Sequence, residues 1–201
     1  MLDHRFALLG AMVALLGNVG YVVDTFRGRI QPNRVSWTIW ALPPFVIFAA
    51  EVHQGVGLAS ALTLACGLGS LAVLIASLRN RYGHYRLVAT DLCCGALALL
   101  SMAVWALTSD PDLAILLAIL TEWLAALPTV LKIYRDPGSE GRVPFLLFTL
   151  GGVITVLAIQ QWSVASSGFA VHTAVTSATI LTMVMLSHRR AATRGSVRTR
   201  V

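Results

Sequence analysis

Two ionisable side chains lie inside otherwise apolar stretches of this sequence. Glu122 lies within the stretch 112–133, and His172 lies within the stretch 167–187, where Thr176 follows one helical turn later. Ionisable residues at hydrocarbon depth are costly and mark binding sites or proton relays. Histidine titrates near neutral pH and can take a proton from a carboxylic acid or from a solute. The pattern predicts solute binding or proton transfer, with a hydrogen bond that only joins helices as the alternative.

The composition indicates that membrane-spanning helices position these side chains. Of the 201 residues, 57% are hydrophobic and 12% are charged, whereas soluble domains are about half apolar and about a quarter charged. An apolar helix of about 20 residues crosses a bilayer. We predict seven such spans, at 6–26, 36–52, 56–78, 87–108, 112–133, 144–162 and 167–187. The predicted fold class is therefore an all-α integral membrane protein with short connections. The first span is too long for a signal-peptide core and is expected to be retained.

The charged residues predict the orientation of the spans. With the N-terminus outside, every basic residue except Arg5 falls on the inner side: Arg27, Arg29, Arg34, Arg79, Arg81, Arg86, Lys132, Arg135, Arg142, Arg189, Arg190, Arg194, Arg198 and Arg200. This asymmetry predicts a multi-pass plasma-membrane protein whose C-terminus is cytoplasmic. The basic tail 189–201 is expected to lie against anionic lipids, so the net charge of +6 does not indicate nucleic acid. Glu51, Asp110 and Asp112 are expected on outer loops.

The sequence also repeats itself with an offset of 108 residues. Phe26-Arg27 aligns with Tyr134-Arg135, Arg34-Val35 aligns with Arg142-Val143, and Trp40 aligns with Phe148. We therefore predict two three-helix blocks, at 1–80 and 111–188, joined by a linker helix at 81–110. An even number of crossings separates the blocks in this 3+1+3 layout, so they are parallel. Parallel repeats related by an axis along the membrane normal are a transporter architecture.

The repeat brings polar residues onto matching helix faces. On a helix, Glu122 shares a stripe with Ala126 and Thr129. The offset of 108 puts Ala14, Asn18 and Tyr21 on the corresponding stripe of the first span. If one stripe lines a central pathway, the other should as well. The predicted pathway residues are Asn18, Tyr21, Glu122, Thr129, His172 and Thr176.

Two matching positions predict flexible points in the first helix of each block. Pro128 lacks an amide hydrogen, and its ring crowds the carbonyl of Leu124. Gly20, its counterpart, weakens a helix more mildly. We predict a hinge at both positions, with the alternative that membrane helices simply tolerate proline and glycine.

Three further residues are candidates for gates or ion pairs near the inner helix ends. Asp24 and Asp91 lie where Arg27 or Arg86 can reach them. Trp37, like Trp40, begins the second span at the inner interface, where aromatic belts are common; a role in a gate is the second interpretation. Pro43-Pro44 is expected to bend this span.

Two stretches carry a family resemblance. The stretches "GYVVDTFRGRIQPNRVSWTIW" (residues 20–40) and "PTVLKIYRDPGSEGRVPFLL" (residues 128–147) resemble the two repeats of the PQ-loop and SWEET transporter superfamily. In that family, a proline dipeptide in the first helix precedes a basic turn and the opening of the next helix. This chain departs from the pattern, because Gly20-Tyr21 replaces the first dipeptide and Thr129 stands where the second has glutamine.

The resemblance implies a transporter that moves a small polar solute, a sugar or similar, by alternating access between two bundles. Proton-coupled transport of an amino acid or other metabolite, using Glu122, is one alternative, and a non-transporting receptor or assembly protein of the same fold is another. The expected partners are the solute and the lipid bilayer, in a monomer or homo-oligomer. We predict no enzymatic activity, no cofactor and no metal. The sequence has no nucleophile motif, no phosphate-binding loop and no pair of histidines at the spacing of metal ligands.

Overall fold

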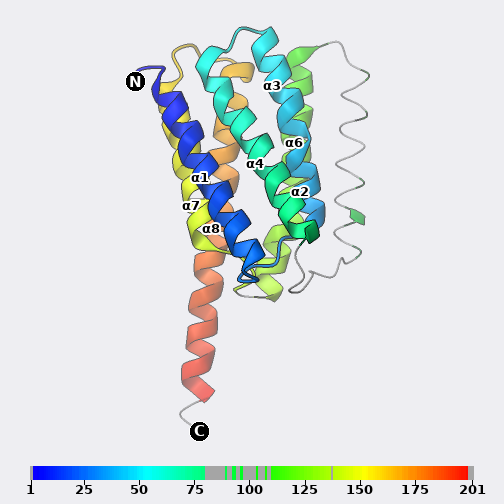
Figure 1. The fold of residues 1–201 in the computed structure, drawn as a ribbon, viewed down its shortest axis with the longest axis vertical. Coiled ribbons are helices and arrows are strands. Elements are labelled where there is room, and N and C mark those ends of the chain that lie inside the picture. The colour runs from blue at the N-terminus through cyan, green and yellow to red at the C-terminus, as the bar shows by residue number, and fades with distance from the viewer. Residues whose placement is uncertain are drawn as a thin grey trace.

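The computed structural model describes residues 2–79, 110–136 and 138–198, together with positions 89, 92, 93, 96, 103 and 107. Across these residues the regular structure is entirely helical (Figure 1). The elements are α1 (Phe6–Phe26), α2 (Arg34–Ala41), α3 (Pro43–His53), η1 (Gly57–Ala59), α4 (Ser60–Arg79), α6 (Pro111–Arg135), α7 (Arg142–Ala158) and α8 (Val164–Arg198). Most of the predicted span 87–108 and linker 81–110, including Asp91, lies outside the described residues.

The helices and their outer surface are compatible with a membrane-embedded protein. Five spans in the described part of the chain are long and apolar enough to cross a bilayer, at Phe6–Phe26, Arg34–His53, Gly57–Arg79, Pro111–Arg135 and Val164–His188. The shorter apolar helix Arg142–Ala158 makes a sixth. Large apolar side chains such as Met12, Leu16 and Leu78 are about 60% exposed. Lipid rather than water is the solvent that suits such a surface.

The second predicted span is two helices rather than one. α2 ends at Ala41 and α3 begins at Pro43, with Leu42 between them at φ −100° and ψ −53°. Pro43 and Pro44 have no amide hydrogen to donate to the preceding turn, so the hydrogen-bond ladder is interrupted here. The two prolines occupy the first turn of α3, where a missing amide hydrogen costs least. The bend that Pro43-Pro44 predicts is thus a complete break in the helix.

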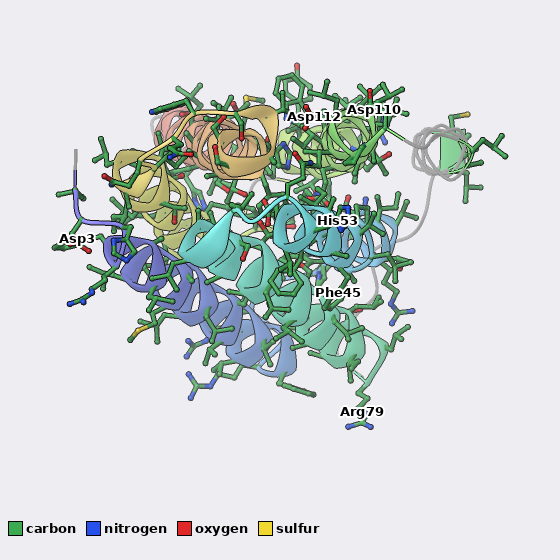
Figure 2. All side chains as sticks on the ribbon, turned by 90° about the horizontal axis from the view of Figure 1, so that it is seen from above. Asp3, Phe45, His53, Arg79, Asp110 and Asp112 are labelled. Carbon is green, nitrogen blue, oxygen red and sulfur yellow. The ribbon has the colours of Figure 1, made fainter. Side chains whose placement is uncertain are left out.

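The described helices pack as two layers, each made from one half of the chain (Figure 2). In the first layer α4 lies between α1 and α2–α3, and in the second α8 lies between α7 and α6. Across the layers, α1 packs against α7, and α6 packs against α2 and α3. In each predicted block, the third span therefore lies between the first and the second. The two layers meet along two interfaces that are equivalent in the repeat.

The C-terminal ends of α7 and α8 differ from the predicted boundaries. α7 ends at Ala158, before the expected end at 162, and Ile159 already has extended backbone angles. α8 continues as a helix to Arg198, so residues 189–198 of the predicted tail prolong the last span beyond the bundle (Figure 1). Alanine and arginine are strong helix formers, which favours this continuation.

Candidate functional site

A cavity of about 60 Å³ lies between the two layers. Every α-helix that the structure describes contributes to its lining: Asn18, Trp37, Trp40, Pro44, Cys66, Ser70, Glu122, Phe145, Phe148, Phe169, His172, Thr173, Thr176, Ser177 and Ile180. Four of the predicted pathway residues are among them, namely Asn18, Glu122, His172 and Thr176. At about 15 Å³ for each water-sized group, the cavity has room for about four such groups.

Glu122, His172 and Thr176 form a chain of polar contacts along one side of the cavity. The Glu122 Oε2 atom lies 3.5 Å from His172 Nε2, and the Thr176 hydroxyl lies 3.2 Å from His172 Nδ1. The imidazole is thus held between a carboxyl group of α6 and a hydroxyl group of its own helix. Both of its nitrogens face a polar partner, which is the arrangement that a proton relay requires.

Two residues that line the cavity each carry a buried oxygen atom with no hydrogen-bond partner in the part of the chain that the structure describes. These atoms are Asn18 Oδ1 from α1 and Glu122 Oε1 from α6. Asn18 is 2% exposed and Glu122 is 4% exposed. The amide of Asn18 is oriented by its Nδ2 atom, which donates to the Ala14 carbonyl oxygen at 3.4 Å. A buried acceptor without a donor is costly, so these two oxygens favour a bound group that donates hydrogen bonds.

Asn18 owes its position to a glycine on the neighbouring helix. A Cβ atom built on Gly69 of α4 would lie 2.1 Å from Asn18 Nδ2. Only glycine therefore leaves room for the amide at this depth. The sequence pattern placed Asn18 on the pathway stripe, but it gave no role to Gly69.

Four aromatic rings from the two halves also line the cavity. Trp37 and Trp40 are 5.2 Å apart at 90°, and Phe145 and Phe148, which occupy the matching positions at an offset of 108, are 5.9 Å apart at 82°. Both pairs have the edge-to-face geometry that aromatic rings prefer. Because Trp37 is 2% exposed and Trp40 is 8% exposed, their interpretation as an interfacial belt was wrong.

A buried polar cluster closes the bundle beneath Trp37. The Trp37 Nε1 atom donates to the Tyr21 hydroxyl at 3.2 Å, and that hydroxyl donates to Glu140 Oε2 at 2.6 Å. Lys132 Nζ donates to Glu140 Oε1 and to the Gln31 carbonyl oxygen. Tyr21 was predicted to line the pathway, but it lies outside the cavity lining and belongs to this closing cluster.

Glu140 is the main functional candidate that sequence reasoning missed. It follows α6 in a short loop yet is 3% exposed, and its carboxylate joins Tyr21 of α1 to Lys132 of α6. An acidic residue among basic ones on the predicted inner side was the only available signal.

Thr129 has a structural contact rather than a place in the cavity lining. Its hydroxyl donates to the Ser36 hydroxyl of α2 at 3.0 Å. One turn after Ser36 on α2, the Trp40 Nε1 atom donates to the main-chain oxygen of Glu122 at 3.1 Å. Both bonds join α6 to α2 beside the cavity.

The remaining predicted residues lie away from the cavity lining. Pro128 lies within α6, which is assigned as one helix from Pro111 to Arg135, and a Cβ atom on Gly20 of α1 would meet nothing within 4 Å. Asp24 pairs with Arg29 at 3.2 Å on the surface, rather than with the expected Arg27.

Glu51 was predicted on an outer loop, but it is 2% exposed within α3. Its Oε1 atom accepts a hydrogen bond from the Thr63 hydroxyl of α4 at 2.9 Å. A short polar partner on the neighbouring helix allows the carboxyl group to be buried.

A second, more polar pocket of about 450 Å³ lies at the opposite end of the bundle from Lys132. Its lining comes from the start of the chain and from the connections around η1 and before α8: His4, Ala7, Gln54, Gly55, Val56, Gly57, Leu58, Ala59, Ala158, Ile159, Gln160, Gln161, Trp162, Ser163 and Ser166. Among the residues that the structure describes, no group of three His, Cys, Asp or Glu side chains could hold a metal ion.

The fold and site can be set against known proteins. Comparison of the chain with protein-family models, with curated proteins and with solved structures finds no match. The geometry of the cavity therefore carries the functional argument that follows.

Proposed function

We propose that this chain is a membrane transporter that moves a small polar solute by alternating access between two three-helix bundles. The observation that carries the proposal is that one cavity is lined by Asn18 and Glu122, one from each half of the chain, whose buried Oδ1 and Oε1 atoms have no hydrogen-bond partner among the described residues. Polar groups at membrane depth are expensive and are commonly retained for solute or ion pathways. A site between two repeats near mid-membrane is typical of secondary transporters.

The helix pairing supports the two-bundle part of the proposal. Each half orders its spans in the same way, and each first helix packs across the layers against the second span of the other half. Together with the offset of 108 residues, this pattern favours the parallel 3+1+3 arrangement and a resemblance to the PQ-loop and SWEET superfamily. The predicted fourth span would be the linker that makes the two halves parallel.

The distribution of basic residues supports an orientation for the proposed pathway. With the N-terminus outside and the C-terminus cytoplasmic in the plasma membrane, the cluster of Tyr21, Lys132 and Glu140 closes the cytoplasmic end. The 450 Å³ pocket at the other end is then an external vestibule. In this proposed orientation the described conformation would be closed on the inside, so that the buried ion pair would have to separate for a solute to leave.

The contact between Glu122 and His172 favours proton coupling as a second candidate. A carboxyl group 3.5 Å from an imidazole can hand over a proton when a solute binds or leaves. Uniport requires no such exchange. The two candidates share one site and differ in whether Glu122 must change its protonation state during each cycle.

Uptake by the purified chain in proteoliposomes tests the proposal. We expect saturable uptake of at least one solute from a panel of sugars, amino acids and amines, and loss of most of this uptake in Asn18→Ala. Glu51→Gln is the matched control, because it alters a buried carboxyl group that does not line the cavity.

Glu122→Gln then separates the two candidates. Proton coupling predicts that this variant loses uptake against a gradient but keeps exchange, whereas uniport predicts that uptake and exchange change together and that a pH gradient has no effect. Binding of a solute without flux by the unmodified chain would contradict transport and favour a receptor.

A further inference from the structure

The charge of the cavity lining is one-sided. Among the residues that the structure describes, Glu122 supplies the only carboxyl group of the lining, and no lysine or arginine belongs to it. Lys132, in the same helix as Glu122, lies outside this lining and contacts Glu140 and Gln31. With Glu122 ionised and His172 neutral, an anionic solute would be repelled, whereas a cation would be attracted.

The unpartnered atoms call for hydrogen-bond donors. Asn18 Oδ1 is an acceptor, and Glu122 Oε1 is an acceptor when the carboxyl group is ionised. A monohydric alcohol has a single hydroxyl hydrogen and cannot donate to both. A protonated primary amine has three N–H donors and one positive charge, which is enough to serve two acceptors and to balance the charge of an ionised Glu122.

The rest of the lining suits the carbon atoms of such an ion. Trp37, Trp40, Phe145 and Phe148 surround the space with aromatic rings. Ring faces attract cations and pack against alkyl groups. Room for about four water-sized groups matches an ion with three carbon atoms and one nitrogen, whereas a hexose is far larger than the cavity of about 60 Å³.

We propose that the cavity binds a small primary alkylammonium ion, with its nitrogen between Asn18 and Glu122 and its alkyl chain against the aromatic rings. The inference rests on the proposed function in that it takes this cavity as the solute site. It adds the chemical class of the solute. His172, on the other oxygen of Glu122, is then the neighbour that holds the carboxyl group in place.

The test is a binding measurement on the full purified chain in detergent. Thermal unfolding is followed with increasing propylammonium chloride, and 1-propanol, sodium propionate and sodium chloride serve as probes of matched size or ionic strength. We expect a saturable rise in the midpoint with propylammonium alone, because a ligand that binds only the folded state stabilises it. Equal stabilisation by 1-propanol or propionate would overturn the proposal.

Variants locate the binding in the cavity. Glu122→Gln should weaken propylammonium binding by about tenfold or more, since it replaces a charged acceptor by a neutral one, and Asn18→Ala should weaken it less. Glu51→Gln should bind as the unmodified chain does. Unchanged binding in Glu122→Gln, measured by calorimetry on protein that unfolds cooperatively, would contradict the proposal.

Failure of this inference can be told apart from failure of the transport proposal. Saturable uptake of another solute without propylammonium binding would refute the amine site and leave transport intact. Propylammonium binding without flux of any amine in proteoliposomes would support the site and refute transport.

Discussion

The two halves of the molecule meet along two interfaces that are built differently. Along the glycine interface, between α1 and α7, the backbones approach closely. A Cβ atom on Gly10 would lie 2.7 Å from the Gly151 carbonyl oxygen, and one on Gly17 would lie 2.8 Å from the Phe148 ring. Small residues allow this close packing in membranes.

Along the polar interface, between α6 and α2–α3, side-chain hydrogen bonds take the place of close backbone contact. Thr129 donates to Ser36, and Trp40 donates to the main chain of Glu122. The second span is also broken here, at Leu42.

The contrast indicates which interface can move. Where the backbones of α1 and α7 are closely packed, sliding of one helix along the other would bring main-chain atoms into steric clash. A few hydrogen bonds beside a break in the helix can be exchanged at lower cost. We infer that the halves pivot about the glycine interface and separate at the polar interface.

The largest expected effect lies where the two interfaces are tied together, at the closing cluster. Lys132→Met leaves Glu140 buried without its cation, and we expect a loss of about 3–5 kcal/mol in the free energy of unfolding. Thermal or denaturant unfolding in detergent measures it. Combining Lys132→Met with Glu140→Leu and Tyr21→Phe should restore much of the stability, because no buried charge then remains. A single variant as stable as the unmodified chain would show that the cluster does not tie the interfaces together.

The glycine interface is broken by Gly151→Val. The added Cβ would lie 2.6 Å from the Gly10 carbonyl oxygen, so the helices must separate, at a cost of about 2–3 kcal/mol. The same unfolding measurement applies. Leu150→Val is the control, because Leu150 is 43% exposed on the outer surface of the same helix. Equal losses in both variants would mean that the close approach of α1 and α7 is not a constraint.

The smallest effect sharpens the description of the polar interface. A double-mutant cycle with Thr129→Val and Ser36→Ala should give a coupling free energy of about 0.6 kcal/mol, the average for side-chain hydrogen bonds between membrane helices. Faster uptake in the double variant is expected if this interface opens during transport. A coupling free energy indistinguishable from zero would show that the hydrogen bond between Thr129 and Ser36 does not stabilise the polar interface.

Helical periodicity and the repeat predicted much of the arrangement of the polar residues, and tertiary contacts decided the rest. Asn18 and Glu122 lie on matching stripes, and both line the cavity. Tyr21 and Thr129 are on the same stripes but lie beyond the cavity, because a stripe fixes direction around a helix and not the depth of the space beside it.

The errors have a common physical origin. Hydropathy cannot distinguish a carboxylate in an exposed loop from a buried one. Glu51 was therefore predicted on a loop, and Glu140 was not singled out. Both are buried because Thr63 and Lys132, respectively, contact their carboxyl groups. The burial of Trp37 likewise depends on contacts with the other half of the chain. In each case a partner distant in sequence decides the outcome.

The central claim is that the cavity between the halves is a water-accessible route across the membrane. Single cysteines at Ser70 and Ser177, one from each half of the lining, test it in liposomes on a background without the three native cysteines. Serine-to-cysteine changes preserve size. We predict that a membrane-impermeant thiol reagent labels both positions and blocks uptake, while cysteines at the outward-facing Leu71 and Val175 stay unlabelled. Labelling at Ser70→Cys and Ser177→Cys no faster than at these outward positions would contradict the account.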